Sequence, residues 1–232
     1  MNSLPAGFRA IVIGASGAIG GAFVDALQAC PGCGGAVALG RQTDPALDLE
    51  DEASIAAAAA ALRAQAPFHL ILNATGALHI GGTPPEKRLA DLDPATLARA
   101  FAINAVGPAL LLKHFAPLLP PKERGLFGSL SARVGSIGDN RKGGWYSYRA
   151  AKAAQNMLLK TASIEIARSR PLAVIAVLHP GTVRSRLSAP IIGDAEALDP
   201  ADAASRLLAV LDGLAPAQSG GFFAYDGKAI EW

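Results

Sequence analysis

Residues 8–27 read FRAIVIGASGAIGGAFVDAL, which is a mostly apolar run, a glycine-rich turn and an apolar pattern with helical spacing. An apolar run of this length is typical of a strand buried on both faces of a parallel sheet. Glycines allow a sharp turn, and the amino end of a helix presents N–H groups and a positive dipole end to a pyrophosphate. The stretch therefore predicts a dinucleotide site, although glycines also serve tight turns that bind nothing.

The rest of the chain continues the alternation of strand-like and helix-like segments. Strand-like segments are AVALG (36–40), a short ALDL (46–49), HLILNA (69–74), GLFGSLS (125–131), LAVIAVL (172–178) and GFFAY (221–225). Helices are expected to about residue 30, through the alanine run 56–61, and over about 93–119, 146–168 and 200–214. Strands that are apolar on both faces need helices on both sides. The pattern predicts one doubly wound, Rossmann-type α/β domain over residues 1–232, with a parallel β-sheet.

Composition narrows the class of partner. The chain of 232 residues is 51% hydrophobic and has a formal net charge of +2, without a basic stripe or an acidic tail. These features give no indication of nucleic acid or a membrane surface as a partner and favour a small molecule. The opening MNSLPAGFRAIVIG has no signal-peptide pattern, and no later run approaches ~18 uninterrupted apolar residues, which predicts a cytoplasmic protein.

The two cysteines form the sequence Cys30-Pro-Gly-Cys33. A single C-x-x-C can be half of a zinc site or a redox pair, but the chain has no second cysteine pair and no nearby histidine to complete four ligands. We expect no metal site and two reduced thiols in a loop.

The spacing of the glycine turn, Gly14-x-x-x-Ala18-x-Gly20, resembles the cofactor loop T-G-x-x-x-G-x-G of the short-chain dehydrogenase/reductase family. Two positions depart from that loop, since Ile13 replaces the threonine and Ala18 the middle glycine. The resemblance implies that the loop binds the cofactor through Gly14, Ser16, Gly17, Ala18, Ile19 and Gly20.

Arg41 follows the second expected strand, where dinucleotide domains read the adenosine ribose. An acidic side chain there binds the 2′-hydroxyl of NAD, whereas arginine pairs with the 2′-phosphate of NADP. Arg41 favours NADP(H) over NAD(H); a solvated loop arginine is the alternative. Asp48 and Leu49 resemble the pair that the family places beside the adenine.

The stretch WYSYRAAK, residues 145–152, holds two tyrosines and a lysine. Residues four apart share a helix face, which makes Tyr148 and not Tyr146 the neighbour of Lys152. A phenol titrates near pH 10, and an adjacent cation shifts its pKa toward neutrality. The pair matches the family's Y-x-x-x-K, which implies that Tyr148 is the general acid or base and that Lys152 lowers its pKa and binds the nicotinamide ribose.

Three further motifs resemble the family in order and spacing. Residues 73–76 (NATG) resemble the N-N-A-G segment, and Asn104 matches the helix asparagine that holds a proton-relay water. The segment HPGTV, residues 179–183, resembles the family's P-G motif after the sixth strand, whose backbone meets the nicotinamide carboxamide. The resemblance assigns these cofactor contacts to Asn73, Ala74, Gly76, Pro180, Gly181, Val183 and Ser185. The segment between residues 180 and 200 is short for a substrate lid.

The catalytic serine of the family is the difficult residue. The pattern S-S-x-x-G, placed on SLSARVGSIG (129–138), makes Ser131 the first serine and puts Ala132 at the usual catalytic position. Ser136 lies just after the glycine. We favour Ser131 as the residue that binds the substrate oxygen, with Ser136 or no serine as alternatives.

The runs 131–157 and 220–232 resemble the C-factor and sniffer-like carbonyl reductase branch of the family. That resemblance implies an NADP(H)-dependent oxidoreductase that acts on a small carbonyl or alcohol substrate, and a homodimer or homotetramer. The alternative is a nucleotide-binding signalling or scaffold protein with the same fold and little turnover.

Overall fold

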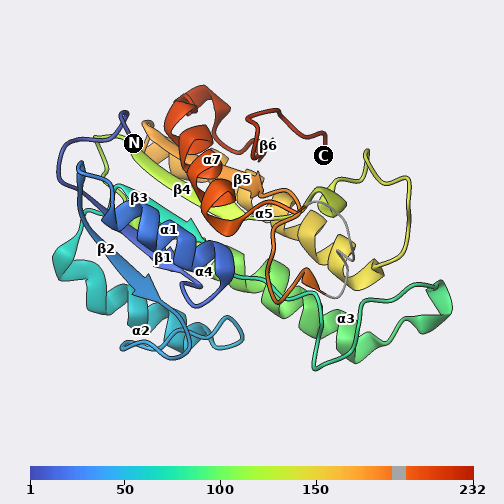
Figure 1. Cartoon of the computed structure of the whole chain (residues 1–232). Helices are drawn as coiled ribbons and strands as arrows, with labels where there is room; N and C mark the ends of the chain where they lie inside the picture. Colours follow the sequence, from blue (N-terminus) through green and yellow to red (C-terminus); the bar gives the residue numbers. More distant parts are fainter. Residues whose placement is uncertain (190–196) are drawn as a thin grey trace.

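Six parallel strands form one sheet in the order β2-β1-β3-β4-β5-β6 (Figure 1) in the computed structural model, which describes residues 1–189 and 197–232. The strands are β1 (Phe8–Ile13), β2 (Cys33–Leu39), β3 (Leu70–Asn73), β4 (Gly125–Leu130), β5 (Ala173–His179) and β6 (Phe222–Ala224). The order changes direction at β1, where Ile13 pairs with Leu39 of β2 on one side and Asn73 of β3 on the other. In such sheets the crevice at this switch point, beyond the carboxyl ends of the strands, is the place for a ligand.

Helices cover both faces of the sheet, as predicted (Figure 1). One face packs against α1 (Ala18–Gln28) and α7 (Pro200–Gly213), and the other against α2 (Glu52–Leu62), α4 (Gly107–Phe115) and α5 (Tyr146–Ser169). Side chains alternate between the faces along β1: Val12 lies in the first core, and Ile11 and Ile13 lie in the second. The central strands β1, β3, β4 and β5 are therefore buried on both sides, whereas the edge strand β2 buries only Leu39 fully.

Two expected elements differ from the structure. The segment ALDL is no strand: it folds back onto the end of β2, where Leu47 is buried and its N–H donates to the Gly40 carbonyl at 2.9 Å. The expected single helix over 93–119 is α3 (Pro94–Phe101), a π-helical segment Ala102–Val106 and α4, followed by a short 3-10 turn. The π-helical segment widens the helix at Asn104.

The helical run Pro94–Leu118 is long and apolar enough to cross a membrane by length and composition alone. Its Leu111, Leu112 and Phe115 are buried in the core formed with the sheet. Cys30 and Cys33 are free thiols that pack beside the α1 and α7 core. Cys33 is the first residue of β2 and does not lie in a loop as expected.

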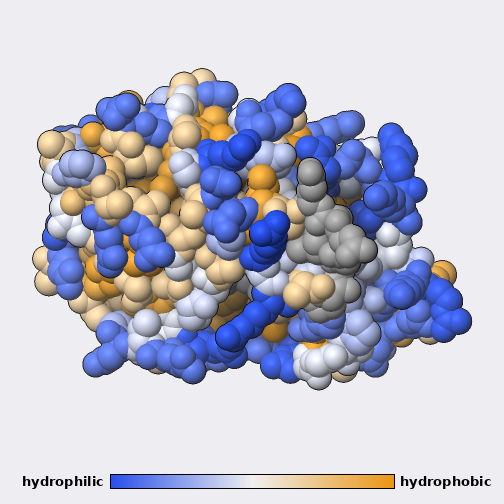
Figure 2. Space-filling view, viewed as in Figure 1, coloured by the Kyte–Doolittle hydropathy of each residue, from blue (hydrophilic) through white to orange (hydrophobic). Residues whose placement is uncertain are grey.

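Hydrophilic side chains gather at the right-hand end of the molecule in Figure 2, over the loop before α5 and the segment before α3. Arg141 and Lys142 in the first of these are exposed. The carboxyl ends of the strands point toward this end (Figure 1), and the predicted site residues follow them.

Candidate active site

The glycine turn between β1 and α1 forms a tight cradle. Gly14 has φ +86°, and a Cβ atom added at Gly20 would lie 2.1 Å from the Gly14 carbonyl oxygen. The helix begins at Ala18 after Gly17, whose missing side chain gives no cap, and its first turn holds no acidic residue. Ser16, Gly17 and Ala18 are exposed and Ile19 is half-buried. An open helix amino end of this kind fits a pyrophosphate.

The loop after β2 carries the three residues expected at the adenosine. Arg41 is exposed, and within residues 1–189 and 197–232 its side chain makes no hydrogen bond or ion pair. Asp48 accepts a hydrogen bond from the Glu50 N–H at 3.0 Å, and Leu49 packs against Gly107, where an added Cβ would lie 2.8 Å from the Leu49 Cβ. The loop thus holds Asp48 and leaves the Arg41 guanidinium exposed to solvent.

Asn73 at the end of β3 is buried and organises the turn that follows. Its Nδ2 donates to Ser129 Oγ at 2.9 Å, and its Oδ1 accepts from the Thr75 N–H at 3.1 Å and hydroxyl at 2.5 Å. The Ala74 N–H donates to the Ile13 carbonyl at 2.8 Å, which joins β3 to β1. The Asn73 side chain is therefore engaged with the protein.

Gly76 brings the main chain close to two candidate catalytic side chains. A Cβ atom there would lie 3.3 Å from Asn104 Oδ1 and 3.4 Å from Lys152 Nζ. Asn104 is fully buried in the π-helical segment; its Oδ1 accepts from the Ala77 N–H at 2.9 Å and its Nδ2 donates to the Ala77 carbonyl at 2.8 Å. The Asn104 amide thus fixes the loop beside Lys152, and π-helical turns of this kind are frequent at functional sites.

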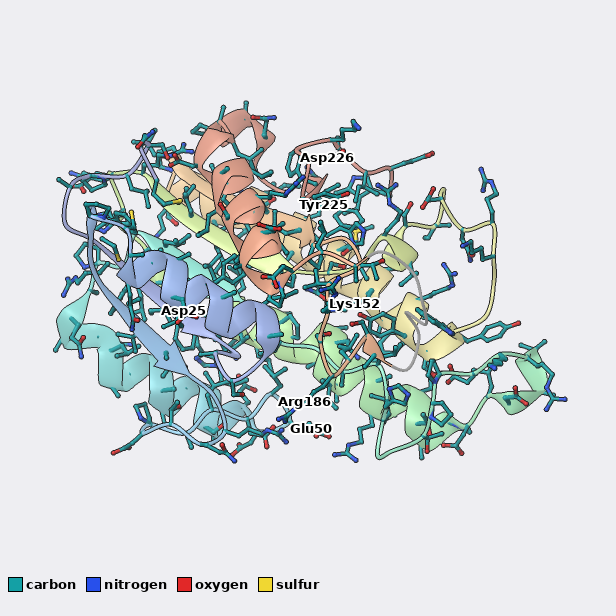
Figure 3. The ribbon with its side chains drawn as sticks, viewed as in Figure 1. Asp25, Glu50, Lys152, Arg186, Tyr225 and Asp226 are labelled. Atoms are coloured by element: carbon teal, nitrogen blue, oxygen red, sulfur yellow. The ribbon has the colours of Figure 1, made fainter. Side chains whose placement is uncertain are left out.

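Tyr148 and Lys152 lie one turn apart on α5, 8% and 2% exposed, with the ammonium nitrogen 5.8 Å from the phenol ring centroid. Figure 3 shows Lys152 near the middle of the molecule. Its Nζ donates to the Leu130 carbonyl at 3.1 Å and to Gln155 Oε1 at 2.9 Å. Helical spacing thus places the tyrosine and the lysine together.

The charge states of this pair differ from the expectation. Burial raises the pKa of the Tyr148 phenol well above its ordinary value and lowers the pKa of the Lys152 ammonium to about 7. The expected fall of the phenol pKa toward neutrality is wrong for this arrangement, because desolvation disfavours the phenolate and the ammonium hydrogen-bonds two neutral acceptors.

The Ser131 hydroxyl is hydrogen-bonded to a residue farther along α5 than Tyr148. Ser131 Oγ donates to Asn156 Oδ1 at 2.8 Å, and Asn156 lies eight residues beyond Tyr148, about 12 Å along the helix axis. Ser136 is also buried, and its hydroxyl accepts from the Asp139 N–H at 3.1 Å. Residue 132, the usual position of the catalytic serine in the family pattern, is alanine.

Glu86 is a site residue that the sequence reasoning missed. The residue before α5, Trp145, has φ +54° and gives no side-chain cap. Glu86 is 7% exposed and supplies the cap: one carboxylate oxygen accepts from the Ser147 N–H at 3.1 Å, the other from the Ser147 hydroxyl, and its carbonyl accepts from the Trp145 N–H at 2.5 Å. Together with the 77–86 loop and Tyr148, it lines a small cavity.

The chain after β5 turns at Gly181, where φ is +79° and an added Cβ would lie 2.8 Å from Tyr225 Cε1. Pro180 precedes this turn. Val183 is buried and bridges to Leu198. Ser185 Oγ lies 3.0 Å from Ser188 Oγ. Residues 190–196, part of the segment that is short for a substrate lid, lie outside the described residues.

Comparison with known proteins finds a matching family model and similar chains. The model of the family described as enoyl-(acyl carrier protein) reductase matches residues 35–219. The 1-hydroxy-2-glutathionyl-2-methyl-3-butene dehydrogenase of Rhodococcus sp. is 32% identical over 84% of this chain and 82% of its own. The C-signal protein of Myxococcus xanthus is 38% identical over 62% of this chain and 83% of its own.

Two solved carbonyl reductases share the fold. The NADPH-bound carbonyl reductase from chicken fatty liver superposes with a TM-score of 0.84 at 24% identity, covering 99% of this chain and 100% of the other. Sniffer of D. melanogaster gives 0.83 at 23% identity, covering 97% and 99%. The doubly wound fold inferred from the sequence is therefore that of these reductases.

Proposed function

This chain belongs to the short-chain dehydrogenase/reductase family of oxidoreductases, and from that premise we propose that it reduces small carbonyl compounds with NADPH. The observation that carries the proposal is the buried pair Tyr148 and Lys152, set beside Gly76 and Asn104 at the carboxyl end of the sheet. The reverse reaction oxidises the corresponding alcohol.

The chemistry follows from the charge that develops on the substrate. Bound NADPH supplies a hydride to the carbonyl carbon. The carbonyl oxygen gains negative charge, and Tyr148 donates its phenolic proton to it. The raised pKa of the buried phenol keeps that proton in place until the oxygen becomes basic. Lys152, while charged, stabilises the resulting phenolate, and Asn104 in the π-helical segment supports a water chain that returns the proton.

The cofactor site is assigned to the loops after β1, β2, β3 and β5. The turn from Gly14 to Gly20 would hold the pyrophosphate at the amino end of α1, and Arg41 would pair with the 2′-phosphate. NADPH is further supported by the carbonyl reductase of the same fold whose structure contains it. The adenine would lie beside Asp48 and Leu49, and the nicotinamide end would be held by Ala74, Gly76, Pro180, Gly181, Val183 and Ser185, with Asn73 holding the turn.

Serine variants test whether Ser131, Ser136 or no serine binds the substrate oxygen. Because the Ser131 hydroxyl is bonded to Asn156, we expect Ser131→Ala to keep kcat within a few-fold of wild type. Ser136→Ala tests the second candidate in parallel. A fall of about 10²-fold or more in either variant would assign that hydroxyl to the substrate oxygen, since that is the range of a lost acid–base or oxyanion contact.

The direct test is NADPH consumption against a panel of aldehydes, ketones and quinones. Tyr148→Phe removes only the hydroxyl and is expected to lower turnover by about 10²–10⁴-fold without loss of NADPH binding. Activity of this variant within a few-fold of wild type would remove Tyr148 from the mechanism. NADPH binding without turnover of any carbonyl compound would instead favour the nucleotide-binding signalling or scaffold function, to which the name of the C-signal relative points.

The whole chain, residues 1–232, is proposed to act as one nucleotide-binding domain in the cytoplasm and to assemble as a homodimer or homotetramer. Exposed apolar side chains on α5, at Met157, Leu158 and Ile164, support assembly through this helix. Size-exclusion chromatography with light scattering tests it, and a monomer at micromolar concentration would contradict it.

A further inference from the structure

Gln155 is fully buried on α5 between the lysine and β4. Its side-chain carbonyl accepts a hydrogen bond from Lys152 Nζ at 2.9 Å. Its amide nitrogen donates to Ser129 Oγ at 2.9 Å and to the Leu130 carbonyl at 3.1 Å. The two donated bonds fix which end of the amide faces the lysine, because the opposite orientation would set N–H groups against the ammonium.

These contacts belong to a longer buried chain of polar groups. Ser129 Oγ also accepts from Asn73 Nδ2 at 2.9 Å, and Lys152 donates its second bond to the Leu130 carbonyl at 3.1 Å. The ends of β3 and β4 are thus connected through Gln155 to the ammonium. An ammonium has three N–H donors, and this arrangement uses two of them on the β4 side. One donor is left for the groups beyond Lys152.

We propose that Gln155 is a positioning residue for the carbonyl reductase reaction, because it anchors the Lys152 ammonium to β4, leaves one N–H donor for the ribose of a bound cofactor and keeps the positive charge beside the tyrosine. This proposal rests on the proposed function for its catalytic consequence. The hydrogen bond between Gln155 and the charged lysine does not depend on turnover.

The surroundings of Lys152 explain why the hydrogen bond to Gln155 affects the charge of the lysine. Tyr148 is the titratable group that faces the ammonium from α5, and the other close groups on β4, the 73–77 turn and the π-helical segment are neutral. The 3-10 turn Arg133–Gly135 packs against Lys152 through Gly135 and carries one charged side chain, Arg133, which is exposed. Burial alone already lowers the pKa of Lys152 to about 7. Each neutral acceptor therefore decides how much of the lysine stays charged near neutral pH.

Two nearly isosteric variants test the proposal. Gln155→Leu removes the acceptor and keeps the volume, while Gln155→Glu keeps an acceptor and adds negative charge. We expect the acid dissociation constant of Lys152 to rise about tenfold in Gln155→Leu, since a bond to a charged group is lost, and to fall in Gln155→Glu. Gln65→Leu, at an exposed position away from the site, is the matched control.

The readout that does not need activity is the pH titration of lysine labelled with ¹³C at Cε in the cofactor-free protein. The Lys152 signal is identified by its loss in Lys152→Arg. Opposite shifts of the midpoint in the two Gln155 variants support the proposal. A midpoint equal to wild type in both, or a shift of the same sign in both, overturns it. If Gln155→Leu does not fold, the direction in Gln155→Glu decides alone.

The kinetic readout connects the anchor to the reaction. In Gln155→Leu, kcat is expected to fall at about one pH unit lower than in wild type, with the Kd for NADPH changed less than kcat. Superimposable pH profiles would overturn the catalytic part of the proposal. If wild type itself reduces no carbonyl compound, the proposed function fails, and the lysine titration still tests Gln155 by itself.

Discussion

Replacement of Glu86 by alanine is expected to destabilise the protein and to disturb the catalytic helix. The carboxylate is 7% exposed and caps α5 by accepting from the Ser147 N–H and hydroxyl, while Trp145 supplies no cap of its own. Without it, two buried donors lose their acceptors. Each orphaned buried donor costs about 1–3 kcal/mol, and a lost cap typically costs about 1 kcal/mol. Because the two effects overlap, we expect the free energy of unfolding to fall by about 3 kcal/mol.

Urea unfolding measures this loss, with two comparison variants. Glu86→Gln keeps one acceptor oxygen and removes the charge at the helix amino end, and is expected to cost about 1 kcal/mol. Glu165→Ala removes an exposed glutamate from the same helix and is expected to stay within about 0.5 kcal/mol of wild type.

The same variants separate the helix cap from the cofactor site. Tyr148 follows Ser147 directly, whereas the glycine turn lies on β1 and α1. Glu86→Ala should therefore lower kcat while the Kd for NADPH stays within a few-fold of wild type. A variant that unfolds at the same urea concentration as wild type, with unchanged kcat, would refute the assignment of Glu86 as the cap of α5.

Three further variants test other parts of the site. Gly20→Ala places a Cβ atom 2.1 Å from the Gly14 carbonyl oxygen and is expected to abolish NADPH binding or folding, which fluorescence titration and circular dichroism check. Arg41→Ala should raise the KM for NADPH about tenfold or more and leave that for NADH unchanged; equal changes would refute the 2′-phosphate contact. For Lys152, the folded pKa of about 7 lies below the ordinary 10.5, which means the unfolded chain binds the extra proton between these values. The stability of wild type relative to Lys152→Met should therefore rise with pH above about 7 in urea unfolding, and a constant difference would contradict the buried, weakly basic lysine.

The fold could be predicted because its signals are local and repeated. The central strands β1, β3, β4 and β5 are apolar runs that are buried on both faces. The sequence of β1, its glycine turn and the following apolar pattern predicts the order strand, turn, helix directly. The prediction of a strand at ALDL was wrong because a short apolar run does not distinguish a strand from a buried loop. Leu47 is buried in a loop that closes on Gly40. The π-helical segment at Asn104 gives no periodic signal distinct from an α-helix.

The candidate site could be predicted only where its partners are close in the sequence. Tyr148 and Lys152 are four residues apart, and helical geometry alone joins them. Glu86 lies 61 residues before Ser147, and no pattern in the sequence connects a loop glutamate with a distant helix end. Gln155 gives no signal of its own in the sequence, since its role depends on the strand end that packs beside it.

In the proposed reaction, the burial of Tyr148 and Lys152 gives proton donation and proton abstraction different pH requirements. A phenol whose pKa is raised by burial remains protonated across the physiological range, which makes Tyr148 ready to act as an acid and a poor base. Oxidation needs the phenolate, and the cation that would stabilise it loses its charge as the pH rises through about 7. The conditions that form the base therefore remove its stabilising partner. Proton donation to a carbonyl oxygen suffers no such conflict below that pH, where Lys152 is charged and Tyr148 still holds its proton.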